Sequence, residues 1–209
     1  MRKVETASRT VAARSVGEDH AGVFTRDKVV LLVIADGSGG QRGGGAASEH
    51  AVASAADRFA RSAAVVDPTV WVEWMHHLDR AIQAHPSMGE TTATVCAIED
   101  GRLVGGASVG DSEALLVTES GVVDLTNGKL RKPLLGSGRA RPRAFFVRRS
   151  TGTIVLGTDG LFKYASHETI ASIARRSAID EVIAGLISAV RLPSGSLQDD
   201  IGIVVYRTT

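Results

Sequence analysis

Acidic residues recur along the chain where apolar runs typical of β-strands begin or end. Four groups share this placement: Glu18-Asp19, Asp36-Gly37, Asp159-Gly160 and Asp199-Asp200. A carboxylate beside a buried strand is unfavourable unless an opposite charge neutralises it. Several carboxylates that converge on one point favour hard divalent cations, which bind oxygen ligands. The pattern therefore predicts a metal site, and metal-assisted hydrolysis is chemistry that such a site supports.

Each acidic group has a simpler explanation when it is taken alone. Asp-Gly is common in turns, so Asp36-Gly37 by itself is better explained as a turn than as a ligand. The glycine-rich residues 37–45 could cradle a phosphate at the start of a helix, but such loops are weak indicators individually. The hypothesis of one shared site depends on all four groups lying at strand ends.

The apolar pattern predicts the elements that would position these groups. Strands are expected at residues 4–13, 21–24, 29–35 and 201–207, and helices at 46–61, 68–85, 167–175 and 180–190. Three hairpins are expected between them: 91–98 with 102–107, 113–118 with 121–125, and 143–149 with 153–158. Trp71 and Trp74 fall on the apolar stripe of the second helix and are expected in the core. This order favours antiparallel sheets with helices packed on their outer faces.

Composition limits the classes of protein to which the chain can belong. Its 209 residues suit one domain, and 44% apolar with 22% charged residues is an ordinary globular balance. The 24 basic and 23 acidic residues almost cancel, which predicts no nucleic-acid or membrane partner. With no apolar leader, membrane span or exposed apolar stripe in the sequence, we expect a cytoplasmic monomer. Cys96, the single cysteine, lies in an apolar run and is expected to be buried and inert.

Six segments of the chain, in order, resemble the motifs of one enzyme family. They are residues 14–19 (Arg-Ser-Val-Gly-Glu-Asp), 33–48 around Asp-Gly-Ser-Gly-Gly, 89–94 (Gly-Glu-Thr-Thr-Ala-Thr), 109–112 (Val-Gly-Asp-Ser), 156–162 (Leu-Gly-Thr-Asp-Gly-Leu-Phe) and 199–205 (Asp-Asp-Ile-Gly-Ile-Val-Val). Together they resemble the metal-dependent Ser/Thr protein phosphatases of the PP2C (PPM) family in their bacterial form. The resemblance implies an α+β fold in one domain of residues 1–209. That fold is a four-layer αββα sandwich, with two antiparallel sheets flanked by helix pairs.

The resemblance also implies how the acidic groups would divide two metal ions between them. Asp36 would bridge both ions, and the backbone carbonyl of Gly37 would bind one of them. Asp159 and Asp199 would bind the other ion, with Asp199 preferred to Asp200 because the family's ligand is the first of the two residues before the final strand. Mn²⁺ or Mg²⁺, two per chain, suits this set of oxygen ligands, whereas zinc would prefer histidine or cysteine.

Further residues would complete the site by the same resemblance. Asp19 would bind a metal directly or, like Glu18, would hold water molecules on it. Asp111 would help to hold a third, weaker metal ion. Arg14 would grip the substrate phosphate with its planar guanidinium group. The catalytic residues implied in this way are Arg14, Asp36 and Asp159.

The implied reaction is the hydrolysis of phosphoserine and phosphothreonine in proteins by a water molecule that two metal ions activate. The partners would be phosphorylated proteins, among them a Ser/Thr kinase or its substrates. Two alternatives stay open. One is a catalytically weak or silent scaffold that binds a phosphoprotein, and the other is a phosphatase of the anti-sigma-antagonist type with one dedicated partner. The intact acidic residues argue against the scaffold, and the sequence does not separate the two kinds of phosphatase.

Three departures from the family pattern change what is expected of the site. Ser38 stands where many members carry a histidine proposed as general acid, and Glu113 replaces the arginine of Gly-Asp-Ser-Arg. The flap of the family is reduced here to about residues 127–132, which predicts an open site with weak substrate selection. Basic residues follow the shortened flap: Arg139, Arg141, Arg143, Arg148 and Arg149. They could steer phosphorylated proteins to the site, or they could be ordinary surface charge.

Overall fold

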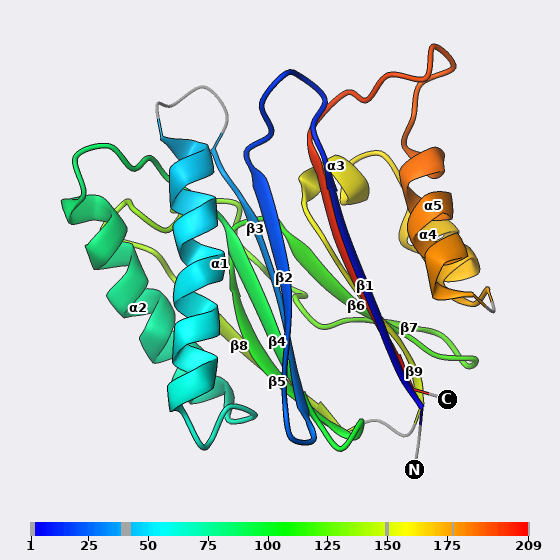
Figure 1. Ribbon diagram of the computed structural model, residues 1–209, viewed down its shortest axis with the longest axis horizontal. Coiled ribbons are helices and arrows are strands. Elements are labelled where there is room, and N and C mark those ends of the chain that lie inside the picture. Colours follow the sequence, from blue (N-terminus) through cyan, green and yellow to red (C-terminus); the bar gives the residue numbers. More distant parts are fainter. Residues whose placement is uncertain (1–2, 39–42, 149–150, 177, 209) are drawn as a thin grey trace.

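The computed structural model describes residues 3–38, 43–148, 151–176 and 178–208. It has four layers, with two five-stranded antiparallel sheets face to face and helices on both outer sides (Figure 1). The first sheet has the order β1 (Val4–Val11), β10 (Ile201–Thr208), β9 (Gly152–Gly157), β6 (Glu113–Val117) and β7 (Val122–Asp124). The second has the order β2 (Asp19–Arg26), β3 (Val29–Asp36), β4 (Ala93–Glu99), β5 (Leu103–Val109) and β8 (Arg143–Arg148). The αββα sandwich expected from the sequence is confirmed.

The helices cover the outer faces of the two sheets as pairs. On the second sheet lie α1 (Gly44–Arg61) and α2 (Pro68–Ala84), and on the first lie α4 (His167–Ala174) and α5 (Ile179–Ala189), while the short α3 (Asp159–Phe162) follows β9. Asp67 begins α2 as expected, because its carboxylate accepts a hydrogen bond from the backbone N–H of Thr69. Within the described residues, no helix has the length and apolar character that a bilayer crossing requires.

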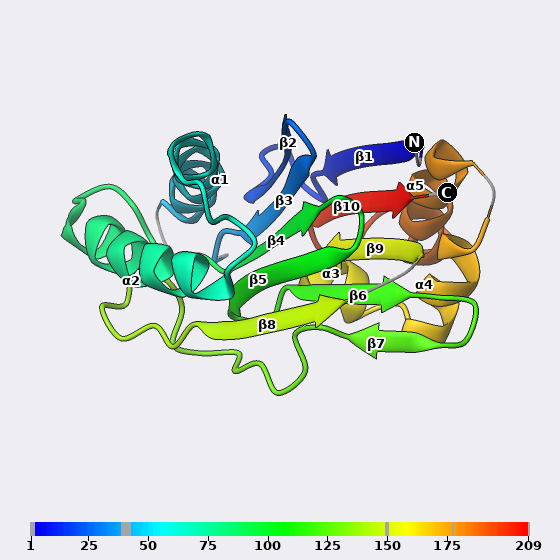
Figure 2. The same ribbon diagram turned by 90° about the horizontal axis from the view of Figure 1, so that it is seen from below.

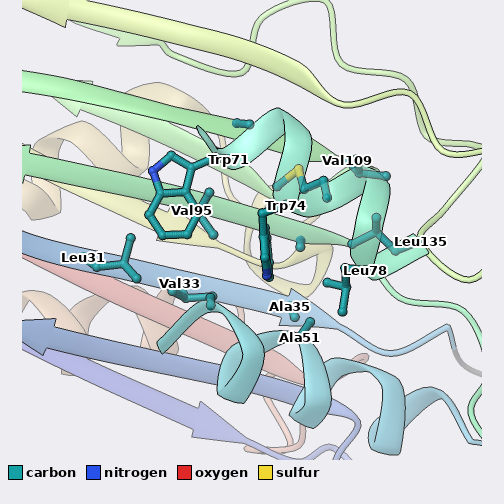
Figure 3. Packing of buried hydrophobic residues seen from close by; sticks show 14 of the residues in the cluster. Leu31, Val33, Ala35, Ala51, Trp71, Trp74, Leu78, Val95, Val109 and Leu135 are labelled. Carbon is teal, nitrogen blue, oxygen red and sulfur yellow. The ribbon is translucent and has the colours of Figure 1, made fainter. Parts of the chain in front are cut away.

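Buried apolar side chains fill the space between every pair of neighbouring layers. One cluster lies between α1, α2 and the second sheet, one between the two sheets, and one between the first sheet and α4 and α5. Trp71 and Trp74 of α2 pack edge to face in the first of these clusters, with ring centroids 5.8 Å apart (Figure 3). Their predicted place in the core is confirmed, and so is the burial of Cys96.

One expected hairpin is wrong. The pairs β4–β5 and β6–β7 form as expected, but β8 pairs with β5 in the second sheet, whereas β9 lies between β10 and β6 in the first (Figure 2). Residues 153–157 of β9 are buried on both faces, so this strand takes an interior position. Strand β8 has exposed residues along its length and lies at an edge. Arg149 and Ser150, which were expected at the end of this strand and in its turn, lie outside the described residues.

The sandwich brings four separate chain segments to one end of the two sheets. The end of β3 and the start of β2 meet there because Asp36 and Asp19 are directly opposite each other in the antiparallel register. The end of β9 and the start of β10 reach the same end from the facing sheet (Figure 1). Strand ends of both sheets therefore supply side chains to one place.

Candidate metal centre

A pocket of about 910 Å³ lies at this end of the sandwich. All eight residues to which the sequence assigned a role line it: Arg14, Glu18, Asp19, Asp36, Gly37, Asp111, Asp159 and Asp199. Residues from β2, β3, α3 and four loops thus converge, although the first and last of them are far apart in the sequence. The proximity of Asp36, Asp159 and Asp199, on which the metal hypothesis depends, is present.

Asp19 and Asp36 lie deepest among these carboxylates. The Asp19 side chain is 7% exposed and accepts a hydrogen bond of 2.7 Å from the hydroxyl of Thr158, which comes from the facing sheet. The same hydroxyl accepts the backbone N–H of Gly202 at 2.9 Å. Asp36 is held by its backbone, since its N–H donates to the Thr92 hydroxyl at 2.9 Å. These bonds hold the Asp19 carboxylate and the Asp36 backbone in place.

Burial, and after it the charge of neighbouring carboxylates, raises the pKa values of three acids in the pocket. Burial raises the pKa of Asp36, and the nearby Asp19, Asp159 and Asp111 carboxylates raise it further. Burial is also the largest cause that raises the pKa of Asp19, opposed by the hydrogen bond from Thr158. The pKa of Asp159 is raised by burial and then by the charge of Asp199. Among the described ion pairs, none involves Asp19, Asp36 or Asp159, although the charges of Lys163 and Arg131 partly oppose the raised pKa of Asp159.

The adjacent residues Asp199 and Asp200 have different surroundings. The two oxygens of Asp200 accept the backbone N–H groups of Ala13 and Glu18, each at 2.7 Å, and so fix the loop that carries Arg14. The Asp199 side chain is 46% exposed, lies 3.7 Å from the Lys163 ammonium and raises the pKa of Asp159. Asp199 therefore has the more available carboxylate of the two, and its choice as the metal ligand stays a prediction.

Glycine is needed at two positions beside these acids. A Cβ at Gly37 would overlap the backbone of Gly44, so glycine lets the end of β3 approach the start of α1. A Cβ at Gly160 would overlap the backbone oxygen of Asp200, where α3 packs against the start of β10. Of the glycine-rich tract, residues 39–42 lie outside the described residues, so its role as a phosphate cradle stays a prediction.

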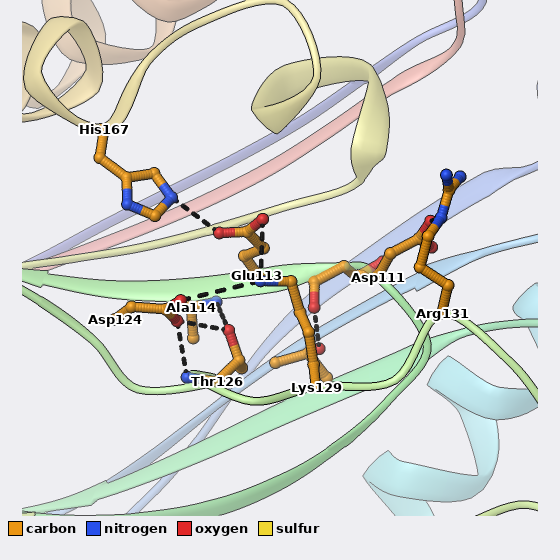
Figure 4. A network of polar contacts seen from close by, with 10 residues as sticks. Asp111, Glu113, Ala114, Asp124, Thr126, Lys129, Arg131 and His167 are labelled. Carbon is orange, nitrogen blue, oxygen red and sulfur yellow. Dashed lines mark hydrogen bonds and ion pairs between the residues drawn. The ribbon is translucent and has the colours of Figure 1, made fainter.

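Sequence reasoning missed the partner of Asp111. The Nε of Arg131 donates to the Asp111 carboxylate at 2.8 Å, and Arg131 lines the pocket as well (Figure 4). The Arg131 side chain is 77% exposed, so solvent screens this ion pair. The clue in the sequence was the basic run within residues 129–132, but nothing local showed that it would fold back onto an acid at position 111.

Glu113, the departure from the family pattern, belongs to a neighbouring polar network (Figure 4). Its carboxylate lies 2.8 Å from Nε2 of His167 and 3.0 Å from the ammonium of Lys129, which also lies 3.7 Å from Asp124. The possible ligand atoms of Glu113, Asp124 and His167 lie within 4.8 Å of one another, but the Lys129 ammonium already lies beside both carboxylates. No metal is needed to explain its geometry.

The residues of the large pocket fit hard divalent cations. Their donors are oxygens, and the mutually repelling carboxylates are stabilised by any added positive charge. Of the described residues, no three in this pocket bring their ligand atoms as close as those of the Glu113 group. Each ion would therefore combine few carboxylates with water or a backbone carbonyl, as Mg²⁺ and similar ions commonly do.

Comparison with known proteins agrees with this geometry. The family model described as stage II sporulation protein E (SpoIIE) matches residues 26–209. The chain belongs to the SpoIIE family. This family is PP2C-like, so the resemblance seen in the sequence is confirmed.

The chain is also similar to a protein that is named as a phosphatase. The serine/threonine phosphatase stp of Listeria innocua is 32% identical over 123 residues, which are 54% of this chain. The match spans about half of that relative, 49% of its length.

Solved structures of other proteins resemble this chain along almost its whole length. The Streptococcus agalactiae serine/threonine phosphatase has a TM-score of 0.82 and 22% identity, with 98% of this chain and 99% of that chain covered. The catalytic domain of the phosphatase PstP, solved in complex with two manganese ions, has a TM-score of 0.80 and 22% identity, with 100% of both chains covered. At such identities the likeness establishes the fold.

Proposed function

We propose that residues 1–209 form one phosphatase domain that hydrolyses phosphoserine and phosphothreonine in proteins with Mn²⁺ or Mg²⁺ as cofactor. The observation that carries this proposal is the cluster of buried and half-buried, mutually repelling carboxylates in a pocket that Arg14 also lines. The names of the relatives support it, since the proteins that resemble this chain include serine/threonine phosphatases.

The metal ligands in this proposal are those that line the pocket. Asp36 and the carbonyl of Gly37, with Asp159 and Asp199, would hold two ions, while Asp19 and Glu18 support them and Asp111 lies beside them. Bound divalent cations lower the pKa of water and neutralise negative charge that develops on a phosphoryl group.

The remaining chemistry belongs to side chains of the pocket. Arg14 is exposed on a loop that Asp200 fixes, so its planar guanidinium can bind two phosphate oxygens and orient the phosphorus atom. Ser38 lines the pocket where a histidine was considered as general acid. A serine hydroxyl is too weak an acid for that role, so the departing serine or threonine alkoxide takes its proton from solvent water.

The test is turnover of p-nitrophenyl phosphate by the full chain with added Mn²⁺ and then with excess chelator. We expect turnover that needs the metal and falls by at least about 100-fold in Asp36→Asn, because metal-ion catalysis supplies several kcal/mol of transition-state stabilisation. Asp57→Asn is the matched control, since it neutralises an exposed carboxylate on α1. No turnover with any divalent ion would favour the phosphoprotein-binding scaffold instead.

The biological setting in this proposal is that of a cytoplasmic monomer that acts on a Ser/Thr kinase or on its substrates. Light scattering of the purified chain checks the monomer. Phosphoproteomic comparison of cells with and without the active chain separates a general kinase antagonist from a phosphatase with one dedicated partner. Many changed sites indicate the first, and a single changed protein indicates the second.

The shortened flap, residues 127–132 between β7 and β8, bears on substrate selection. We propose that the reduced flap leaves the pocket open. Of its residues 127–132, Arg131 and Lys132 line the pocket. Grafting the longer flap of a relative should raise discrimination among phosphopeptides. Unchanged selectivity after grafting contradicts this part of the proposal.

A further inference from the structure

A second pocket of about 450 Å³ adjoins the acidic one and has the opposite charge. Lys132, Arg139 and Arg141 line it, and Glu90 is the one carboxylate among its described lining residues. Lys132 lines both pockets, so the two cavities share a wall. The basic pocket therefore begins where the proposed phosphatase site ends.

The loop that presents these cations is held by a buried carboxylate. Asp79 of α2 is 4% exposed, and its two oxygens accept three backbone N–H groups. The donors are Gly136 at 2.7 Å, Gly138 at 2.9 Å and Ala140 at 3.0 Å. A buried carboxylate that is fully occupied by loop N–H groups fixes the backbone from residue 136 to residue 140.

The fixed backbone directs the two arginines outward. Ala140 is 6% exposed and points into the core, so Arg139 and Arg141 on either side of it are exposed. Asp79 binds only backbone groups of this loop, which leaves both guanidinium groups available to a ligand. Their position is thus a property of the fold, beyond simple surface charge.

The other end of the loop is tied to the acidic pocket. Leu135 and Thr91 exchange two backbone hydrogen bonds of 3.0 Å, and the Thr91 hydroxyl donates to the backbone oxygen of Asp36 at 2.9 Å. The basic pocket consequently has a set position relative to Asp36. A substrate with its phosphorylated side chain in the acidic pocket would reach the basic pocket with a residue at a fixed spacing from that side chain.

We propose that Lys132, Arg139 and Arg141 form an anion-binding subsite for an acidic or second phosphorylated side chain of the same substrate. Carboxylate and phosphate both match the fork of a guanidinium group, so either could occupy it. The inference rests on the proposed phosphatase function and names its substrate class: phosphoserine or phosphothreonine with a neighbouring negative charge. The net charge of +1 for the whole chain favours this local recognition over general binding of polyanions.

The experiment compares phosphoserine peptides that differ only beside the phosphoserine. One has neutral neighbours, two carry glutamates on its N-terminal or C-terminal side, and two carry a non-hydrolysable phosphonate there. With wild type, at least one charged peptide should have a kcat/KM about tenfold above the neutral peptide, as rim charges at an interface act mainly on encounter and positioning. In Arg139→Gln/Arg141→Gln this ratio should fall to near one. The glutamate and phosphonate arms show which anion is preferred.

Arg9→Gln/Arg80→Gln is the matched control, because it removes the same charge from exposed arginines that line neither pocket. It should retain the wild-type ratio. An equal ratio in wild type and Arg139→Gln/Arg141→Gln overturns the subsite, and so does an equal loss in the control pair. Binding of a fluorescent charged peptide to the chelator-treated chain, followed by anisotropy, gives a second readout. It should weaken in Arg139→Gln/Arg141→Gln alone, and equal affinities there overturn the subsite even if the chain proves not to be a phosphatase.

Discussion

Asp79 on α2 and Asp36 at the end of β3 are both carboxylates withdrawn from solvent, but their surroundings are opposite. Asp79 receives three backbone N–H groups and organises the loop from residue 136 to residue 140. Asp36 faces the carboxylates of Asp19, Asp159 and Asp111, and burial with this repulsion raises its pKa. The charge of Asp79 is buried but is satisfied by backbone donors of the protein itself, so its role is structural. A buried charge that its neighbours repel indicates a partner from outside, and in the proposed site that partner is a divalent cation.

The largest effect on stability is expected at Asp79. Asp79→Ala leaves three backbone donors without an acceptor; the Ala140 N–H is buried and the other two are part-buried, and a buried donor left unpaired costs about 1–3 kcal/mol. We expect a loss of about 3 kcal/mol in the free energy of unfolding, measured by urea denaturation of the chelator-treated chain. A loss no larger than that of the surface variant Asp57→Asn would mean that the three hydrogen bonds contribute little.

The stability of the metal-free chain should depend on pH because the pKa of Asp36 in the acidic pocket is raised. Folding raises the pKa of Asp36 from the ordinary 3.8 to about 9, with burial as the largest cause. Between these values the folded chain keeps a proton that the unfolded chain has released, so this group makes folding less favourable as the pH rises. Without metal, the urea midpoint should therefore fall from acid to alkaline pH within this range. Saturating Mn²⁺ should remove most of that decline, and a decline that Mn²⁺ leaves unchanged would point to other groups.

Neutralising Asp36 should stabilise the metal-free chain. At neutral pH the folded chain keeps a proton on Asp36 that the unfolded chain releases; Asp36→Asn removes this cost, and replacement of buried ionisable groups is often stabilising by about 1–4 kcal/mol. We expect a gain near the lower end of that range at neutral pH in chelator, with the sign opposite to that of Asp79→Ala. Urea denaturation of both variants in one buffer makes the comparison. A destabilised Asp36→Asn would remove the contrast between the two carboxylates.

The smallest expected effect concerns Arg131. Its ion pair with Asp111 is exposed and so contributes about 0.2–1 kcal/mol, which corresponds to a change of up to about fivefold in cation affinity. Arg131→Gln should tighten Mn²⁺ binding by this modest factor because it removes a competing positive charge, whereas Arg131→Lys should keep the wild-type affinity. Competition with a fluorescent chelator measures both. Weaker binding in Arg131→Gln would show that this arginine supports the metal site instead of opposing it.

Local sequence predicted the acidic site because its signals are local. Asp36 and Asp159 each follow an apolar run and precede a glycine, and the antiparallel register then places Asp19 opposite Asp36. The placement of β8 and β9 in different sheets could not be predicted in the same way. Alternation of apolar residues marks a strand, but it does not specify which sheet accepts it.

The long-range hydrogen bonds of Asp79 and Arg131 could not be predicted from the sequence for a similar reason. Asp79 and the backbone groups that it binds are separated by 57, 59 and 61 residues, and Arg131 lies 20 residues from Asp111. On a helix, an aspartate at position 79 is indistinguishable from any solvent-exposed acid until the loop is packed against it. Hydrogen bonds of this kind depend on tertiary structure, and no local propensity encodes them.

Calorimetric titration of Mn²⁺ into the chelator-treated chain tests the central claim most directly. Wild type should bind the ion, and Asp36→Asn should bind it more than about 100-fold more weakly, since loss of even an outer support of a metal site costs about 10–100-fold in affinity. Asp57→Asn should match wild type. Equal binding by wild type and Asp36→Asn would contradict the assignment of the buried carboxylates as a metal centre.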